Sequence, residues 1–189
     1  MSCNKKLVDL LFWKDMISGD ESAFSSIFKS YYQPLYNFGK LYASDKALIN
    51  DSIQDLFMDF WEKRKNLKPE VDVEAYIYGA FRFKILRRIN QKFLFTSFHE
   101  DHLNVIYEIS KEDLEIRNEI DQERIVKIND LLNQLPPKQK EVIYLKFYKG
   151  LSNEQIAKIL DINYQSVKNY VFRSLQVLRE KSNKEDYNN

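Results

Sequence analysis

Apolar residues recur every three or four positions through much of this chain, the spacing that places side chains on one face of an α-helix. From Asp20 onward the segment "ESAFSSIFKSYYQPLYNFGKLY" has such a face, and Pro34 is expected to kink or divide the helix. The segment "DSIQDLFMDFWEKR" has a second, continuous apolar face. It contains Ile53, Leu56, Phe57, Phe60 and Trp61. We expect this second face to belong to a core.

The opposite side of the second helix is acidic. It carries Asp51, Asp55, Asp59 and Glu62 at nearly helical spacing, where an exposed helix would usually mix lysines among the acids. Two interpretations stay open. The acids keep this face solvated, or they form a docking face for a basic partner.

Aromatic and basic residues are mixed in "AYIYGAFRFKILRRINQKFLF", which follows a loop marked by Pro69. Rings on which bases stack, beside cations that hold phosphates, are typical of sites for single-stranded nucleic acid. A second interpretation makes one face of this helix core and leaves only the charges in water. That core face would contain Ile77, Phe81, Ile85 and Ile89. The two interpretations are compatible because they use different faces of one helix.

The C-terminal part predicts further helices with marked boundaries. The pair Pro136–Pro137 ends one helix, and Gly150 suits the C-cap of the next. Ser152 followed by Gln155 is a capping-box signature, which predicts that another helix begins directly after Ser152.

The stretch "SNEQIAKILDINYQSVKNYVFRSL" contains two helical patterns joined by a sharp turn at Asp161, and Asn163 can cap the second helix. This spacing fits a helix-turn-helix, in which the outward face of the second helix enters the major groove. An ordinary helical hairpin has the same spacing, so the basic charge of the surrounding segment is what favours DNA. The outward face contains Gln165, Lys168, Asn169, Phe172, Arg173 and Gln176.

Composition favours an all-α protein, because only 4 Gly and 4 Pro occur in 189 residues. The single cysteine, Cys3, excludes an intramolecular disulfide, and His99 and His102 lack partners at metal-ligand spacing. No carboxylate cluster, glycine loop or nucleophile-base pair stands out. We therefore expect no catalytic residue, no metal, no cofactor and no small-molecule substrate.

The net charge of +1 conceals blocks of opposite sign. Residues 63–92 carry nine basic and three acidic side chains, and residues 124–183 carry eleven and five, so each block has a net charge of +6. Residues 96–123 carry two basic and nine acidic side chains, a net charge of −7. Two basic blocks that flank an acidic one suit a polyanion bound at two places.

These patterns predict two small helical domains, residues 1–95 and 124–183, joined by an acidic linker, residues 96–123, and followed by a tail, residues 184–189. The N-terminal segment is too short and too charged in its apolar part for a signal peptide, and no run of about 18 apolar residues follows. We expect a cytoplasmic protein that is not embedded in a membrane.

The order of these motifs resembles that of the extracytoplasmic-function (ECF) sigma factors, compact bacterial initiation subunits of RNA polymerase, over residues 18–182. "AFSSIFKSYYQPLYNF" is similar to the start of their first conserved domain, and "INDSIQDLFMDFWEK" to their acid-rich core-binding helix. "LNQLPPKQKEVIYLKFYKGLSNEQIAKILDINYQSVKNYVFRSLQVLRE" is similar to their C-terminal domain. The resemblance implies sigma region two in residues 1–95 and a region-four helix-turn-helix in residues 124–183.

The resemblance also implies a role for individual residues. Core polymerase would be bound through Asp51, Gln54, Asp55 and Met58. The loop at residues 66–72 and the following helix would open the minus-ten element by capturing an unstacked base, with Tyr76, Tyr78, Arg82, Lys84, Arg87 and Arg88 as the DNA contacts. The minus-thirty-five element would be read by Gln165, Ser166, Lys168, Asn169 and Arg173. The acidic linker would run toward the RNA path of the polymerase, and an anti-sigma factor is implied as a further partner.

Two other classes of protein account for part of the pattern. An ordinary helix-turn-helix regulator, with an N-terminal part that senses a ligand or dimerises, needs neither the acidic stripe nor the basic-aromatic helix. A nucleic-acid enzyme would need a catalytic cluster, which the sequence does not contain. A sigma factor without a catalytic site of its own accounts for all of these features together.

Overall fold

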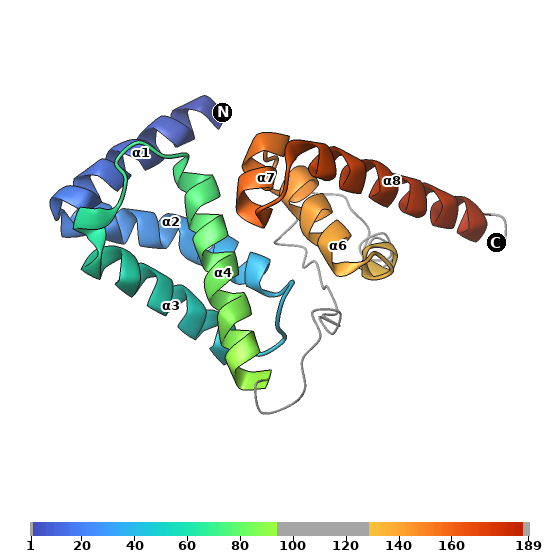
Figure 1. The fold of residues 1–189 in the computed structure, drawn as a ribbon, viewed down its shortest axis with the longest axis horizontal. Coiled ribbons are helices and arrows are strands. Elements are labelled where there is room, and N and C mark those ends of the chain that lie inside the picture. The colour runs from blue at the N-terminus through green and yellow to red at the C-terminus, as the bar shows by residue number, and fades with distance from the viewer. Residues whose placement is uncertain (1, 94–128, 187–189) are drawn as a thin grey trace. The chain divides into compact units, whose positions relative to one another are not determined.

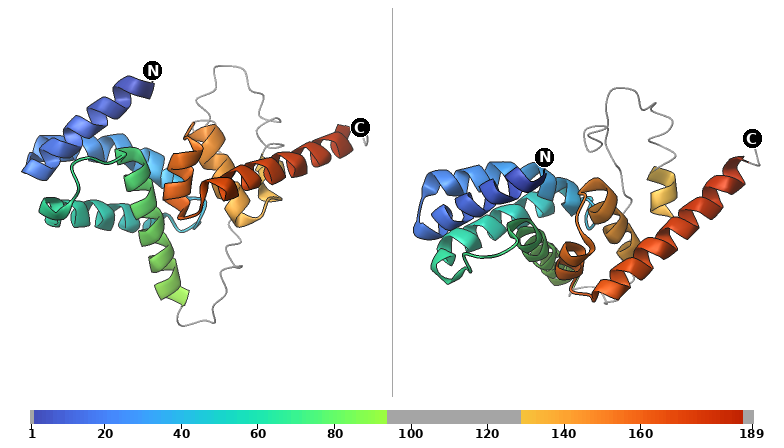
Figure 2. Two further views of the ribbon diagram at one scale, coloured as in Figure 1. Left: turned by 45° about the horizontal axis from the view of Figure 1, so that its top comes forward. Right: turned by 90° about the horizontal axis from the view of Figure 1, so that it is seen from above.

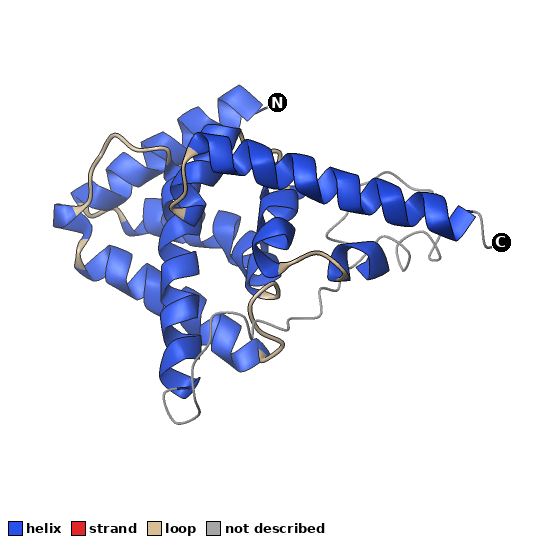
Figure 3. Cartoon of the chain, turned by 45° about the vertical axis from the view of Figure 1, so that its right-hand side comes forward, coloured by secondary structure: helices blue, strands red, loops and turns tan. Residues whose placement is uncertain are grey.

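A computed structural model of the chain describes residues 2–93 and 129–186. The described residues form helices joined by turns and short loops, with no strand among them (Figure 3). Contacts divide the chain into two compact units, of which the first contains residues 2–93. The all-α prediction is therefore confirmed. The predicted acidic linker, residues 96–123, lies outside the described residues.

The first unit consists of four α-helices and one short 3-10 helix (Figure 1). They are α1 (Ser2–Ser18), α2 (Glu21–Gly39), α3 (Lys46–Glu62), η1 (Arg64–Asn66) and α4 (Val73–Phe93). Helix α1 packs against α2 and α4, and α3 packs between α2 and α4 (Figure 2). The sequence pattern predicted the first helix only after Asp20, so α1 was not predicted.

Aspartate caps start two of these helices. Asp20 accepts hydrogen bonds from the backbone N–H groups of Ser22 (2.7 Å) and Ala23 (3.2 Å). Hydrogen bonding from the Ser22 side chain, followed by these two backbone bonds, holds the pKa of Asp20 below its ordinary value. Asp45 caps α3 in the same way. Helix α2 continues past Pro34 as one element, so Pro34 does not divide it.

The core of the first unit is rich in aromatic side chains. Trp13, Tyr31, Phe38, Phe57, Tyr78 and Phe81 are almost completely buried. Ile53, Leu56, Phe57 and Phe60 of the predicted α3 stripe are buried as expected, and Trp61 at its end is half-buried. The core also contains one carboxylate, Asp9 of α1, which accepts a 2.6 Å hydrogen bond from the Tyr31 hydroxyl. Burial and this carboxylate raise the pKa of Tyr31, so it stays protonated as the donor.

The second unit contains α6 (Pro137–Ile143), a π-helical turn (Tyr144–Tyr148), α7 (Asn153–Leu160) and α8 (Tyr164–Asp186). The predicted capping box is present, because Ser152 Oγ accepts from Gln155 N (3.2 Å) and Gln155 Oε1 accepts from Ser152 N (3.0 Å). Asp161 makes the turn between α7 and α8 in the left-handed conformation, with φ 53° and ψ 50°. Asn163 Oδ1 accepts from Ser166 N at 2.7 Å and caps α8.

No helix in the described part of the chain has both the length and the apolar character that a bilayer span requires.

Candidate nucleic-acid interface

The exposed side of α3 carries the four residues predicted to bind a partner. Asp51, Gln54 and Met58 are exposed, and Asp55 is half-buried beside them. Met58 leaves 58% of its surface in water, an unusual exposure for a large apolar side chain next to carboxylates. The turn spacing of three and four residues puts the four on one stripe, while Ile53 and its buried neighbours face the core.

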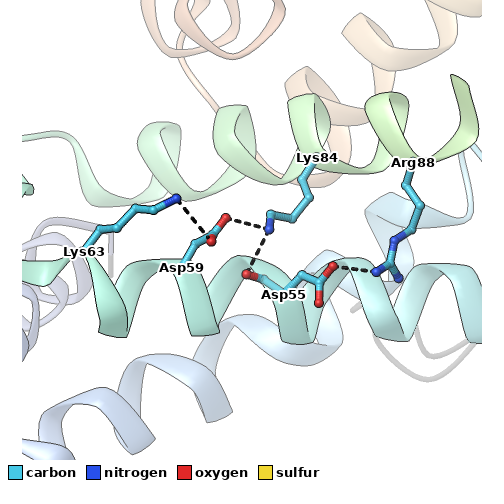
Figure 4. A network of polar contacts seen from close by, with 5 residues as sticks. All are labelled: Asp55, Asp59, Lys63, Lys84 and Arg88. Atoms are coloured by element: carbon cyan, nitrogen blue, oxygen red, sulfur yellow. Dashed lines mark hydrogen bonds and ion pairs between the residues drawn. The ribbon is translucent and has the colours of Figure 1, made fainter. Parts of the chain in front are cut away.

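Cations of α4 meet this stripe (Figure 4). Arg88 Nη1 lies 3.2 Å from Asp51 Oδ2, and Arg88 Nη2 lies 2.5 Å from Asp55 Oδ2. Lys84 Nζ lies 2.6 Å from Asp59 Oδ2 and donates to the Asp55 backbone carbonyl at 3.0 Å. The hydrogen bond from Lys84 lowers the pKa of Asp59. Of the predicted DNA contacts, Arg88 therefore pairs with two acids predicted to bind the polymerase, whereas Lys84 pairs with their neighbour Asp59.

These ion pairs are only partly buried. The side chains of Asp51 and Asp55 are 61% and 44% exposed, whereas Arg88 is 30% exposed. Half-exposed pairs of this kind contribute about 1 kcal/mol or less each, because water screens both charges. The acids thus keep a solvent-facing side on which a second cation can bind.

The remaining predicted contacts of α4 are placed in different environments. Arg87 is exposed, and Arg82 is half-buried. Tyr76 keeps 39% of its surface in water, but Tyr78 keeps 1% and packs against Phe38 with ring centroids 5.1 Å apart. Tyr76 is thus accessible at the surface, whereas Tyr78, predicted as a DNA contact, lies in the core. Tyr78 directly follows Ile77, a residue of the predicted core face. A prediction that allowed a broader buried face on this helix would have assigned Tyr78 to the core.

Trp13 of α1 is a residue of this region that the sequence reasoning missed. Its indole Nε1 donates a 2.9 Å hydrogen bond to the backbone carbonyl of Lys68, inside the loop at residues 66–72. Its ring meets Phe60 edge-on at 5.4 Å and Tyr76 at 5.5 Å. A tryptophan between a lysine and a phenylalanine gives no sequence signal for this contact, which depends on a partner 55 positions away.

The second unit displays the predicted DNA-reading side chains on α8. Gln165, Lys168, Asn169 and Arg173 are exposed, and Ser166 is half-buried. Val167 and Ser174 are buried on the other side, where Ser174 Oγ lies 3.3 Å from Gln139 Oε1 of α6. Phe172, between the polar residues of the outward face, is 62% exposed. Helix α8 thus has one side anchored on α6 and one side open along its first three turns.

Across residues 2–93 and 129–186, no three His, Cys, Asp or Glu side chains gather in a way that could hold a metal ion.

Comparison with known families assigns both units. A Sigma-70 region 2 model matches residues 27–92, and a Sigma-70, region 4 model matches residues 125–178. The chain belongs to the ECF sigma factors. In this sigma factor the region 2 match contains the α3 stripe and the α4 cations, and the region 4 match contains α7 and most of α8. Helix α1 and its Trp13 precede the region 2 match.

Individual relatives agree with this assignment. The sigma factor is 23% identical over 159 residues to RNA polymerase sigma factor SigZ of Bacillus subtilis (strain 168), which covers 82% of this chain and 84% of the relative. It is 25% identical over 167 residues to ECF RNA polymerase sigma factor SigX of the same strain, with 85% and 84% covered. The sigma factor RpoE from Bartonella quintana, solved with the anti-sigma factor NepR, shares the fold. Its TM-score is 0.62 at 21% identity, with 83% of this chain and 94% of that chain covered.

Proposed function

We propose that this sigma factor binds core RNA polymerase, recognises the minus-ten and minus-thirty-five elements of its promoters, and initiates DNA-templated transcription through three separate surfaces. The observation that carries the proposal is the presence of region 2 and region 4 in one chain, in that order. An ordinary helix-turn-helix regulator would account for the second region alone. Synthesis of RNA is left to the core enzyme, and the place of action is the cytoplasm.

The first surface is the α3 stripe, through which Asp51, Gln54, Asp55 and Met58 bind core polymerase. Its support is the exposure of a large apolar side chain, Met58, between acids that keep a face in water. A basic helical partner suits it, because cations can meet the carboxylates while an apolar group covers Met58. Protein interfaces commonly combine such a central apolar contact with charged residues around it.

The second surface combines the loop at residues 66–72 with α4, and it opens the minus-ten element. Tyr76 supplies an exposed ring on which an unstacked base can stack, and Arg82 and Arg87 supply charge for phosphates. Lys84 and Arg88 also become available to phosphates when a polymerase cation replaces them at the α3 carboxylates. Tyr78 supports the surface from the core beneath it.

The third surface is the outward face of α8, which reads the minus-thirty-five element. Gln165 and Asn169 carry amides that match base edges, and Lys168 and Arg173 carry charge for phosphates or guanine. Ser166 sits in the first turn of the helix, where its side chain could contact a phosphate of the bound DNA. Gln165 Nε2 donates to Asn169 Oδ1 at 3.2 Å, so the two amides are already aligned along one edge of the helix.

We assign residues 1–95 to region two, residues 96–123 to a linker, residues 124–183 to region four and residues 184–189 to a tail. The linker is proposed to follow the RNA path, where its net charge of −7 would stand in for transcript. An anti-sigma factor is proposed as a regulator, in keeping with the complex in which the Bartonella quintana relative was solved.

Transcription with purified components tests the proposal. Bacterial core polymerase with and without this protein is given a promoter library, and run-off transcripts are sequenced to map their start sites. We expect transcripts that depend on the protein and share two sequence elements upstream of their starts. The absence of such transcripts with an active core enzyme, together with failure of the protein to co-elute with that core, would reject the function.

A further inference from the structure

Trp13 ties the first unit together at the loop that follows α3. Its side chain has no exposed surface, and its N–H donates to the Lys68 carbonyl at 2.9 Å. Its ring touches Phe60 of α3 and Tyr76 of α4, so one residue of α1 contacts all three parts of this corner. The region 2 match begins at residue 27, so α1 and Trp13 lie outside the matched part, whereas the residues that Trp13 contacts lie inside it.

The loop is held at two points. Trp13 fixes the Lys68 carbonyl, and Asp72 accepts a 3.1 Å hydrogen bond from Ala75 N, which anchors the other end on the first turn of α4. Pro69 and Glu70 lie between these points and are exposed. The loop therefore presents a short, fixed stretch to solvent, directly before the exposed Tyr76.

Tyr76 is held by the same cluster. Its ring stacks on Phe60 with centroids 5.8 Å apart and planes at 26°, and Trp13 packs edge-on against both rings. One face of the Tyr76 ring thus packs against the protein, while 39% of the residue's surface stays exposed to water. A base that leaves a duplex needs a ring already in place, because ordering flexible groups during binding reduces affinity.

We propose that Trp13 is a positioning residue for base capture: it fixes the loop at Lys68 and the ring of Tyr76 so that an unstacked base enters a preformed site. This inference rests on the proposed function. A buried indole N–H that loses its acceptor is costly, so the bond to Lys68 holds the loop more firmly than apolar packing alone. Phenylalanine at this position would keep most of the ring contacts and release the loop.

The test measures how much a captured base adds to binding. Holoenzyme reconstituted from core polymerase and the full chain is titrated with fork DNA that carries the mapped minus-ten element, intact or with one abasic position. Scanning the abasic position with the wild type identifies the captured base as the site of the largest loss, expected to be roughly tenfold. With Trp13→Phe, affinity for intact DNA should fall by roughly that factor and affinity for the abasic DNA should stay the same.

Trp61→Phe is the matched control, because it makes the same chemical change at the other tryptophan, which stacks on Arg64 at 4.4 Å. It should keep the full difference between intact and abasic DNA. Pro69→Gly is the second test variant. It loosens the exposed loop without touching the core, and it should shrink the difference as Trp13→Phe does.

Equal losses on both DNAs with Trp13→Phe would mean that Trp13 only stabilises the fold, and this would overturn the inference. An unchanged difference with Trp13→Phe would also overturn it. If Trp13→Phe does not fold, an unchanged difference with Pro69→Gly rejects loop positioning. Failure of the proposed function is recognised earlier, because the wild-type holoenzyme would then give no promoter-dependent transcript.

Discussion

Arg88 competes within the protein for the acids that are proposed to bind core polymerase. Its guanidinium lies 3.2 Å from Asp51 and 2.5 Å from Asp55. Arg88→Gln removes this positive charge and leaves the two carboxylates in place. A basic partner then meets a more negative stripe, whether it would have displaced Arg88 or bound beside it, so affinity for core polymerase should rise.

The size of the effect follows from Coulomb's law. A partner cation on the outer side of the carboxylates would lie roughly 6 Å from the Arg88 charge, and in a water-like dielectric that repulsion is about 0.7 kcal/mol. Its removal corresponds to about threefold tighter binding. The loss of two half-exposed pairs should lower the free energy of unfolding by about 1 kcal/mol. Stability and affinity are thus expected to change in opposite directions.

The assay is a titration of fluorescently labelled protein with core polymerase, in the absence of DNA, at low and at high salt. The gain should fade at about 1 M salt, where the screening length falls to about 3 Å. Arg87→Gln is the control, because it removes the same charge from the exposed side of α4. Unchanged or weaker binding of core polymerase by a folded Arg88→Gln variant would refute the reasoning. An equal gain in affinity with Arg87→Gln would show that the gain comes from the net charge of the protein and not from the position of Arg88.

Three further changes test other parts of the two units. Met58→Lys should weaken core binding roughly tenfold without lowering thermal stability, because the side chain is 58% exposed; normal affinity would exclude Met58 from the interface. Replacing Lys168 and Arg173 by Ala should reduce the slope of log binding constant against log salt concentration for promoter DNA, by about one unit for each phosphate that the variant no longer neutralises. Ala at the exposed Arg179, further along α8, is the control and should leave this slope unchanged. The pKa of Asp59 is held below its ordinary value by Lys84, so its contribution to stability is present at neutral pH and is lost as the pH falls through that lowered value. The difference in melting temperature between wild type and Asp59→Asn should therefore be full near pH 7 and narrow only as the pH falls below the ordinary aspartate pKa of about 3.9.

Local signals predicted the second unit well. Ser152 and Gln155 form the expected capping box, and the turn before α8 depends on Asp161 at φ 53°. These features are encoded within a few residues, because a cap or a left-handed turn needs only its immediate neighbours. Sequence reading succeeds where the physics is local.

Helix α1 was missed because its first half departs from the usual pattern, although Trp13 and Met16 in its second half are buried. Leu7 and Leu11 are 58% and 54% exposed, whereas the carboxylate of Asp9 between them is buried. That burial depends on the Tyr31 hydroxyl, 22 positions later, which donates a 2.6 Å hydrogen bond to it. A buried acid with a distant donor cannot be recognised from spacing alone.

The net charge counted along the sequence is also larger than the positive charge that this part of the chain leaves available to DNA. Residues 63–92 have a net charge of +6, yet Lys63, Lys84 and Arg88 each lie within 3.3 Å of an α3 carboxylate oxygen. The side-by-side packing of α3 and α4 converts two separate charge runs into one partly neutralised surface. A DNA strand that reaches this unit alone therefore meets less positive charge along α4 than the sequence indicates. A polymerase cation that displaced Arg88 from the α3 acids would return the guanidinium to solvent, and in that case the same ion pairs would favour polymerase binding before promoter opening.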